Sequence, residues 1–283
     1  MSPTLRRRRL GRQMRDRRTA LKLSGTDIAN YIGKMNQSRW SKIEIGKAKL
    51  THFQLGKAVE ILQPTPEQAE RWHEWWEHGD QLGWWSDYVD VITEHDEMLA
   101  GFELDAAHVR QYVDAYIPTL LADEAYTRAV VSASQHTRPV DMSRVVEFRM
   151  LRQQRLTDPD FRYTVVIGEA ALHGHVGGRL VLASALRHLL DANWAATVEI
   201  LVAPFTADAY GAKGMSFEIT QFSDPEDPEA VFVESGPGSG FLEKPSELRY
   251  YNNLFSVAAS RAVALDIEDS RRRIEEIWAM YSG

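Results

Sequence analysis

The stretch from Leu21 to Gly46 constrains the fold of this chain more than any other, because it predicts two short helices joined by a tight turn. Ser24 and Asn36 are polar residues of the kind that cap helix N-termini. After each cap, apolar residues recur at helical spacing. They are Ile28, Ala29 and Ile32 in the first predicted helix, and Trp40 and Ile43 in the second. Gly33 is predicted to end the first helix, since glycine enters the left-handed conformation at little cost. The pattern is typical of a helix-turn-helix, although other helical hairpins share it.

The outer face of the second predicted helix is polar and carries positive charge. Arginine and lysine match the acceptors of guanine in the DNA major groove, and glutamine matches the edge of adenine. We therefore predict that this helix and its cap contact DNA bases. The predicted base-contacting residues are Asn36, Gln37, Ser38, Arg39 and Lys42.

Charge is distributed unevenly along the chain. Residues 1–62 hold 15 Lys/Arg against 4 Asp/Glu, a net of +11, whereas the remaining residues hold 18 against 36, a net of −18. Positive charge in this N-terminal part, which we call the head, is what attraction to DNA phosphates requires. The alternative explanation of the charge is a chance cluster of solvated arginines. Residues 6–9 either follow phosphates or enter a minor groove as an arm, or they form the solvated first turn of a helix. The predicted phosphate contacts are Arg6, Arg7, Arg8, Arg9, Lys34, Lys47 and Lys49.

Residues 10–62 resemble the DNA-binding domain of the lambda-repressor-like, xenobiotic-response-element (Xre) family of bacterial regulators. The matching residues are Arg18, Leu23, Ser24, Ile28, Ala29, Gly33, Gln37, Ser38, Ser41, Ile43, Glu44 and Gly46. In that family, residues at the places of Arg18 and Glu44 pair to tie helix one to the recognition helix, so the resemblance implies a structural pair here. The chain departs from the family pattern at Gly25, where the family often has glutamine, and its turn is one residue longer.

A tryptophan-rich stretch follows the head. Its large apolar side chains favour a core or a domain interface, and the more specific alternative is an aromatic cage for a ligand. The tryptophans are Trp72, Trp75, Trp76, Trp84 and Trp85. From residue 83 onward the chain resembles an effector-like domain of unknown function that commonly follows this DNA-binding domain in actinobacterial regulators. The similarity includes GWWSDYVDVI (83–92), EFRMLRQQRL (147–156), VVIGEAALHGHVGG (165–178) and LRYYNNLFSVAASRAV (248–263).

Three residues of this part are candidates for a ligand or partner surface: Trp84, Trp85 and Glu169. Glu169 matches a glutamate usual in the similar family. It is a ligand contact, a helix cap or half of an ion pair, and the last two together are favoured.

The rest of the chain has mixed periodicity. Helical spacing covers residues 103–115, 123–134, 141–156, 180–192, 246–263 and a final amphipathic helix from 266. Short β-branched or aromatic runs predict strands at 162–167, 197–202, 215–222 and 230–234, with a turn at 224–229 and a loop at 234–240. We predict an all-α helix-turn-helix domain (1–66), a Trp-rich helical connector (67–100) and a larger α+β effector or interaction domain (101–283).

Several classes of function lack their sequence signals. The chain contains no cysteine and no long apolar run, so we expect a cytoplasmic protein without a membrane span. His173 and His175 have no third ligand nearby, which argues against a metal site. Phosphate-loop and nucleophile-elbow patterns are absent, so we expect no catalysis and no cofactor.

The leading hypothesis is a dimeric transcription regulator that binds a palindromic operator in double-stranded DNA. The alternative is an antitoxin-like interaction module that responds to a small protein encoded by an adjacent gene, with DNA binding serving autoregulation. A third reading is that the larger domain binds a small molecule.

Overall fold

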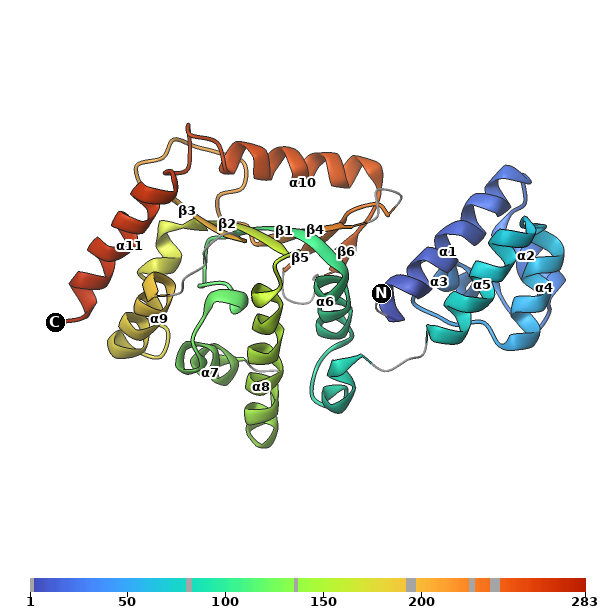
Figure 1. Ribbon diagram of the computed structural model, residues 1–283, viewed down its shortest axis with the longest axis horizontal. Helices are drawn as coiled ribbons and strands as arrows, with labels where there is room; N and C mark the ends of the chain where they lie inside the picture. Colours follow the sequence, from blue (N-terminus) through green and yellow to red (C-terminus); the bar gives the residue numbers. More distant parts are fainter. Residues whose placement is uncertain (1–2, 80–82, 135–136, 192–196, 224–226, 235–239) are drawn as a thin grey trace. The chain divides into compact units, whose positions relative to one another are not determined.

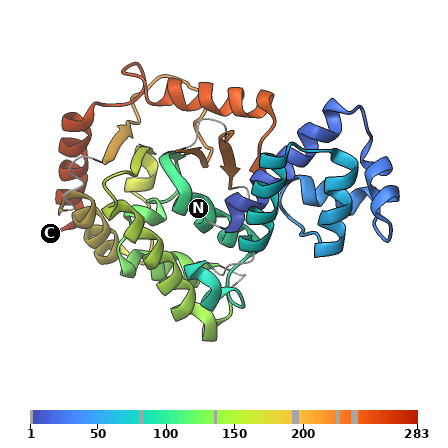
Figure 2. The same cartoon turned by 45° about the vertical axis from the view of Figure 1, so that its right-hand side comes forward.

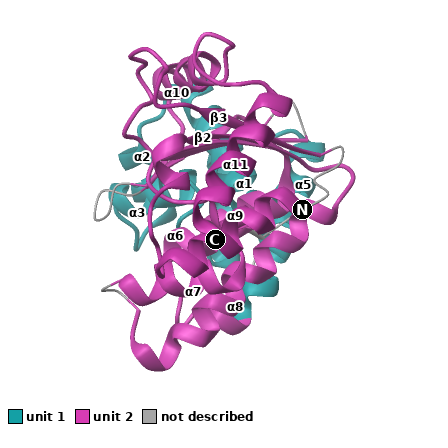
Figure 3. Cartoon of the chain, turned by 90° about the vertical axis from the view of Figure 1, so that its left-hand side faces the viewer, with its two compact units in different colours: residues 1–86 teal, residues 87–283 magenta. Residues whose placement is uncertain are grey.

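The computed structural model describes residues 3–79, 83–134, 137–191, 197–223, 227–234 and 240–283. The chain divides into two compact units, Met1–Ser86 and Asp87–Gly283, which Figure 3 shows in teal and magenta. The described part of unit 1 is helical, and the sheet lies entirely in unit 2. The fold is therefore α+β, with the helical unit first.

Five α-helices make up the described part of unit 1. They are α1 (Pro3–Ala20), α2 (Gly25–Ile32), α3 (Gln37–Glu44), α4 (His52–Leu62) and α5 (Pro66–His78). Both predicted caps are confirmed: the Ser24 hydroxyl accepts a hydrogen bond from the Asp27 N–H, and Asn36 Oδ1 accepts one from the Arg39 N–H at 2.8 Å. Gly33 ends α2 with φ at +73°, as its residue type predicts.

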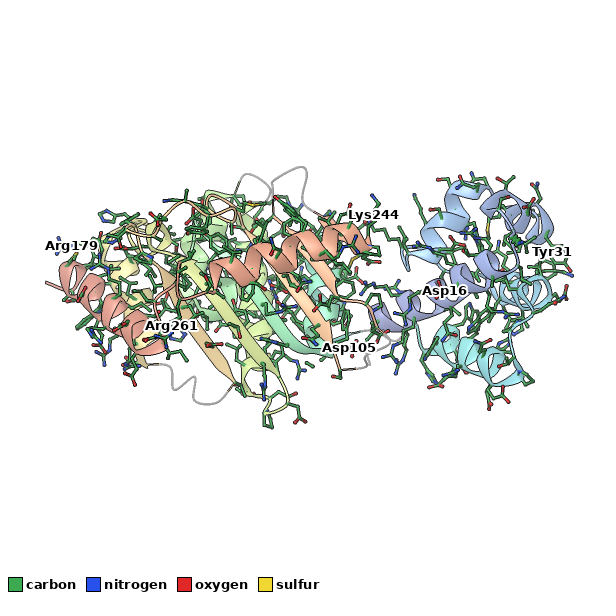
Figure 4. The ribbon with its side chains drawn as sticks, turned by 90° about the horizontal axis from the view of Figure 1, so that it is seen from above. Asp16, Tyr31, Asp105, Arg179, Lys244 and Arg261 are labelled. Carbon is green, nitrogen blue, oxygen red and sulfur yellow. The ribbon has the colours of Figure 1, made fainter. Side chains whose placement is uncertain are left out.

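The core of unit 1 draws on all five helices. Met14, Trp40, Leu55 and Trp72, from α1, α3, α4 and α5, are fully buried in one cluster that also takes in Ile28 of α2. Figure 2 shows these helices, blue to cyan, wrapped around one another. Tyr31 of α2, which Figure 4 labels, adds a surface link by donating a hydrogen bond to Glu60 of α4.

The first compact unit extends beyond the predicted domain boundary at residue 66, because it includes α5. Trp72 Nε1 donates to Gln13 Oε1 of α1, and Trp76 Nε1 donates to the Leu50 carbonyl, each at 2.7 Å. These tryptophans pack with the core of unit 1, so the first part of the predicted connector 67–100 lies within that unit. Its residues up to Ser86 belong to unit 1, and the others belong to unit 2.

Unit 2 is built on a six-stranded mixed sheet in the order β3-β2-β1-β4-β5-β6. β1, β2 and β3 run parallel, and β4 is antiparallel to β1 and to β5, which is antiparallel to β6. The strands are β1 (Ala106–Val113), β2 (Arg162–Gly168), β3 (Val198–Ala203), β4 (Phe217–Phe222), β5 (Ala230–Val233) and β6 (Gly240–Leu242). The helices are α6 (Glu94–Asp105), α7 (Glu124–Ala133), α8 (Met142–Arg152), α9 (Arg179–Asp191), α10 (Pro245–Ala258) and α11 (Ile267–Tyr281).

Helices cover both faces of this sheet, with α10 on one face and α6 to α9 on the other (Figure 1). Side chains alternate between the faces, as the pleat requires. Val109 and Val113 of β1 belong to the core under α7, α9 and α11, whereas Tyr112 belongs to the core under α10. β1 is thus buried on both sides at the centre of the sheet.

The helix predicted at 103–115 is the main error of secondary structure. α6 ends at Asp105, and β1 follows at once from Ala106. Polar residues interrupt the apolar alternation of this central strand, because Arg110 pairs with Glu229 and Gln111 accepts a hydrogen bond from Tyr163. The resulting mixture of polar and apolar positions resembles a helical period.

The other predicted elements of unit 2 have structural counterparts. The four predicted strands are confirmed as β2 to β5, whereas β6 was not predicted. The predicted helix 246–263 ends earlier, at Ala258. The predicted turn at 224–229 and loop at 234–240 fall partly outside the described residues. No described helix has the length and apolar character needed to cross a membrane.

Candidate functional site

The outward face of α3 carries the residues predicted to contact bases. Gln37, Ser38, Arg39 and Lys42 are all exposed, while Trp40 and Ile43 on the opposite side of the helix are buried. None of these four side chains forms an ion pair with a described carboxylate, and Gln37, Ser38 and Lys42 make no side-chain hydrogen bond within the described residues. A row of polar side chains is therefore open to an external partner.

Asn36 differs from its neighbours, because it serves as the N-cap of α3. Its side-chain oxygen is taken up by the Arg39 N–H. The side chain thus sets the start of the helix rather than extending from its outer face. The Arg39 guanidinium makes one long contact to the described residues, from Nη2 to the Lys49 carbonyl at 3.5 Å.

Arg18 and Glu44 form the pair that the resemblance implies. Arg18 Nε donates to Glu44 Oε1 at 2.6 Å, and a second nitrogen donates to Oε2 at 3.2 Å. Trp40 Nε1 also donates to Oε1, at 2.6 Å, and Arg18 donates to the Leu23 carbonyl at 2.8 Å. One carboxylate therefore ties α3 to α1, and both groups are engaged within the unit. The hydrogen bond with Glu44 raises the pKa of Arg18.

Gly11 lets α1 approach the end of α3 more closely than a residue with a side chain would. A Cβ atom built at Gly11 would lie 2.3 Å from the Ile43 carbonyl oxygen and 2.7 Å from that of Glu44. Nothing in the sequence pattern marked this glycine. Its role emerges only from the packing of the two helices.

The arginines at residues 6–9 are not an extended arm, because α1 already begins at Pro3. Arg8 is only 9% exposed, and Arg6 donates a hydrogen bond to the His78 carbonyl at 3.2 Å. Arg7 and Arg9 are half-buried. The first helical turns thus hold these side chains partly against the other helices of unit 1.

The three lysines predicted to contact phosphates lie in two turns. Lys34 sits in the α2–α3 turn with φ at +52°, and Lys47 is in the turn after α3; both are exposed. Lys49 is half-buried, with Nζ 4.6 Å from the centre of the Trp76 ring. This cation–π contact holds Lys49 close to the surface, beside the end of α3.

The three candidates for a ligand or partner surface differ in their exposure to solvent. Trp84 keeps 37% exposure, whereas Trp85 is only 2% exposed, so Trp85 is an interior residue. Glu169 is also buried: it accepts hydrogen bonds from the Phe205 N–H at 2.8 Å and from Arg273 Nη2 at 2.5 Å. It is half of an interior ion pair, which leaves Trp84 alone on the surface.

Burial alone would raise the pKa of Glu169, but the Phe205 N–H and the Arg273 guanidinium together hold this pKa below 4.5. His173 lies beside the pair, with Nε2 3.5 Å from the Glu169 carboxylate and Nδ1 2.9 Å from the Tyr281 hydroxyl. Among the described residues, no group of three or more acidic, histidine or cysteine side chains is placed to hold a metal ion.

A buried polar group in unit 2 was not predicted from the sequence. Arg152 of α8 donates to both oxygens of Glu103, at 2.8 and 2.5 Å, and Glu218 of β4 lies close enough to shift the pKa of the arginine. All three side chains are buried. The signal available was a glutamate between Phe217 and Ile219 in a run of strand-forming residues. Alternation places it on the face opposite to these two residues, and it is buried because helices cover that face as well.

Comparison with known proteins identifies one family. A family model described as "Domain of unknown function (DUF5753)" matches residues 97–276, which is more than half of the chain and falls within unit 2. No curated protein and no solved structure matches the chain. The chain therefore belongs to the DUF5753 family.

Proposed function

We propose that this protein is a sequence-specific DNA-binding transcription regulator in which unit 1 is a helix-turn-helix head. In this proposal α3 enters the major groove, and unit 2 supplies dimerisation and regulation. The observation that carries the proposal is the row of exposed side chains on α3, Gln37, Ser38, Arg39 and Lys42, which have no acidic partner within the described chain. A surface of this chemistry suits the edges of bases.

The rigidity of α3 supports the proposal. Arg18 and Trp40 both hold Glu44, and Trp40 and Ile43 anchor the inner side of the helix. A reading helix fixed in this way loses little conformational freedom on binding, because its backbone is already ordered. Polar side chains on a fixed helix therefore meet DNA in one register.

Charge supports the same partner. Residues 1–62 carry a net of +11, and the exposed lysines Lys34 and Lys47 flank the two ends of α3. Positive groups on both sides of a reading helix match the two phosphate strands that border a groove. A single head of this size contacts few base pairs, so the proposal includes a dimer on two half-sites about one helical turn apart.

The experiment that tests the proposal compares variants of the full chain on a selected DNA site and on its single-base variants. Gln37→Ala should lose about 1–3 kcal/mol on the parent site and relax specificity at one base pair. Lys47→Ala should instead weaken binding to all sequences alike and reduce the salt slope by about 1.

The control is Arg271→Ala, which removes an exposed positive charge from α11 in unit 2 and should leave binding unchanged. If Gln37→Ala discriminates among all site variants as the parent does, α3 does not read bases. If Arg271→Ala and Lys47→Ala weaken binding equally, the attraction is a property of total charge, and the assigned interface is wrong.

A further inference from the structure

Unit 2 contains a cavity of about 170 Å³ on the side of the sheet that α6, α7 and α8 cover (Figure 1). Residues from β1, β4 and β5 line its sheet side, and residues from the three helices and from the segment after β1 form the rest of its lining. Val113, Leu120, Val130 and Phe232 give it apolar walls. An engineered apolar cavity of about 150 Å³ in another protein holds benzene, so this space suits a molecule of about six to ten non-hydrogen atoms.

Two polar side chains that line the cavity have atoms without a hydrogen-bond partner among the described residues. They are Oε1 of Glu218 and Oγ1 of Thr127, and each side chain belongs to a residue only 2% exposed. Leaving a buried polar group unpaired costs about 1–3 kcal/mol. Both therefore have capacity to bind an external polar group at the cavity.

The charges around the cavity leave Glu218 as the surplus acid. Arg152 is satisfied by its two hydrogen bonds to Glu103. The other cavity arginine, Arg149, lies near Asp96 and Glu234: burial lowers the pKa of Arg149, and these two carboxylates oppose that shift. Four carboxyl groups thus share two guanidinium groups, so ionisation of Glu218 as well would favour a further cation beside it.

We propose that this cavity binds a small organic amine, with Glu218 as the anionic partner of its ammonium group, Thr127 as a second polar contact and the apolar walls around its hydrocarbon body. A small amine supplies both features that the cavity lacks: a hydrogen-bond donor for the unpartnered carboxylate oxygen and a positive charge. This inference concerns unit 2 alone and does not depend on DNA binding by unit 1.

The protonation state of Glu218 gives a second, measurable consequence of amine binding. Burial raises the pKa of Glu218 to about 8, the charges of Glu103 and Glu234 act in the same direction, and Arg152 opposes them. Tyr163 also lies near Glu218 and Glu103, whose charges raise its pKa together with burial. Without a ligand, the Glu218 carboxyl is therefore mostly protonated at pH 7. Binding of an ammonium ion ionises it, and the proton passes to the solvent.

The test measures binding to the full chain by thermal shift and by calorimetry at pH 7. The probes are 2-phenylethylamine, hexylamine and 1,4-diaminobutane, each beside its alcohol; phenylacetate serves as the anion of matched size. At millimolar concentration, at least one amine should raise the melting temperature by about 2–4 °C, and its alcohol and phenylacetate should not. Calorimetry in buffers of different ionisation enthalpy should show release of a proton on binding.

Glu218→Gln should abolish the preference for the amine over its alcohol, because the neutral amide no longer supplies a negative charge. Glu268→Gln, which changes an exposed acid of α11, is the matched control and should retain the preference. If Glu218→Gln does not fold, the deciding result is whether the parent protein releases a proton when it binds the amine: release supports the proposal, and no release overturns it. The proposal is overturned if no amine shifts the melting temperature, if amine and alcohol bind equally, or if only phenylacetate binds, which would make Arg149 the anchor.

Discussion

Arg18 of α1 and Glu44 of α3 make a two-point contact, with Nε–Oε1 at 2.6 Å and Nη2–Oε2 at 3.2 Å. The two residues are separated along the chain by α2, so this contact closes the head around the inner side of α3. Trp40 donates to the same carboxylate, so one acidic side chain of α3 joins the Trp40 indole to the Arg18 guanidinium. The proposed reading face and its support are thus two sides of the same helix.

Replacement of Arg18 tests that support. Arg18→Met removes both bonds to Glu44 and leaves the carboxylate with Trp40 only, so the free energy of unfolding should fall by about 1–3 kcal/mol. Urea unfolding followed by tryptophan fluorescence measures the loss. Lys57→Met is the control, because it removes an ion pair to Glu60 at the exposed surface and should change nothing measurable. Equal effects from both variants would mean that the Arg18 pair has no special role.

A pair of glycine substitutions tests the close approach of α1 and α3. Gly11→Ala places a methyl group against the Ile43 carbonyl, and the shift this forces should cost about 1–3 kcal/mol. Gly56→Ala, inside α4 with no atom within 4 Å of the added carbon, should stabilise the protein by about 0.5–1 kcal/mol. Thermal melting of both variants gives opposite signs if the geometry is right. A neutral Gly11→Ala variant would contradict the packing described for α1.

The ion pair between Glu169 and Arg273 predicts acid sensitivity in unit 2. The folded pKa of Glu169 lies below 4.5, so the pair stabilises the fold above about pH 4.5 and this stabilisation is lost as the pH falls. Arg273→Met should cost about 2 kcal/mol at pH 7, with allowance for the partial exposure of the arginine, and should weaken the dependence on pH.

Arg272→Met is the matched control, since Arg272 is exposed and its one ion pair with a described residue is to Asp269 on its own helix. Urea unfolding of both variants at pH 7 and pH 4 separates the two arginines. An Arg273→Met protein that loses no more stability at pH 7 than Arg272→Met would show that the interior pair contributes nothing.

Glu218 predicts the opposite dependence on pH. Its folded pKa is about 8, so the folded state holds a proton that the unfolded state releases above about pH 4.5. The stability contribution of this group should therefore decrease as the pH rises from about 4.5 to about 8, by up to about 1.4 kcal/mol per pH unit. Glu218→Gln should remove that slope in urea unfolding across this range. If stability of the Glu218→Gln variant depends on pH as steeply as that of the parent protein, the buried proton is held by a group other than Glu218.

Much of unit 1 was predictable because its signals are local. Ser24 and Asn36 cap the helices they precede, and Gly33 adopts the positive φ that its position requires. These features depend on a few neighbouring residues, so the sequence pattern carries them directly. The exposure of Gln37 and Lys42 followed from the same helical period.

The errors arose where distant segments decide the structure. Trp72 belongs to the head because its indole reaches Gln13, a contact that no local pattern contains. β1 resembled a helix because Arg110 and Gln111 find their partners on other elements. The cavity around Glu218 brings together three helices and the sheet, so its unpartnered oxygen was not predictable from the spacing of residues.

The most direct test of the proposed function is selection of binding sites from a random pool of double-stranded DNA by the purified full chain. The selection should be carried out near physiological ionic strength, where sequence-blind attraction to phosphates is weakened. We predict enrichment of one motif with two inverted half-sites about 10 base pairs apart, and loss of enrichment at one position in Gln37→Ala. Recovery of DNA without a shared motif, bound equally by the parent and Gln37→Ala, would contradict sequence recognition by α3.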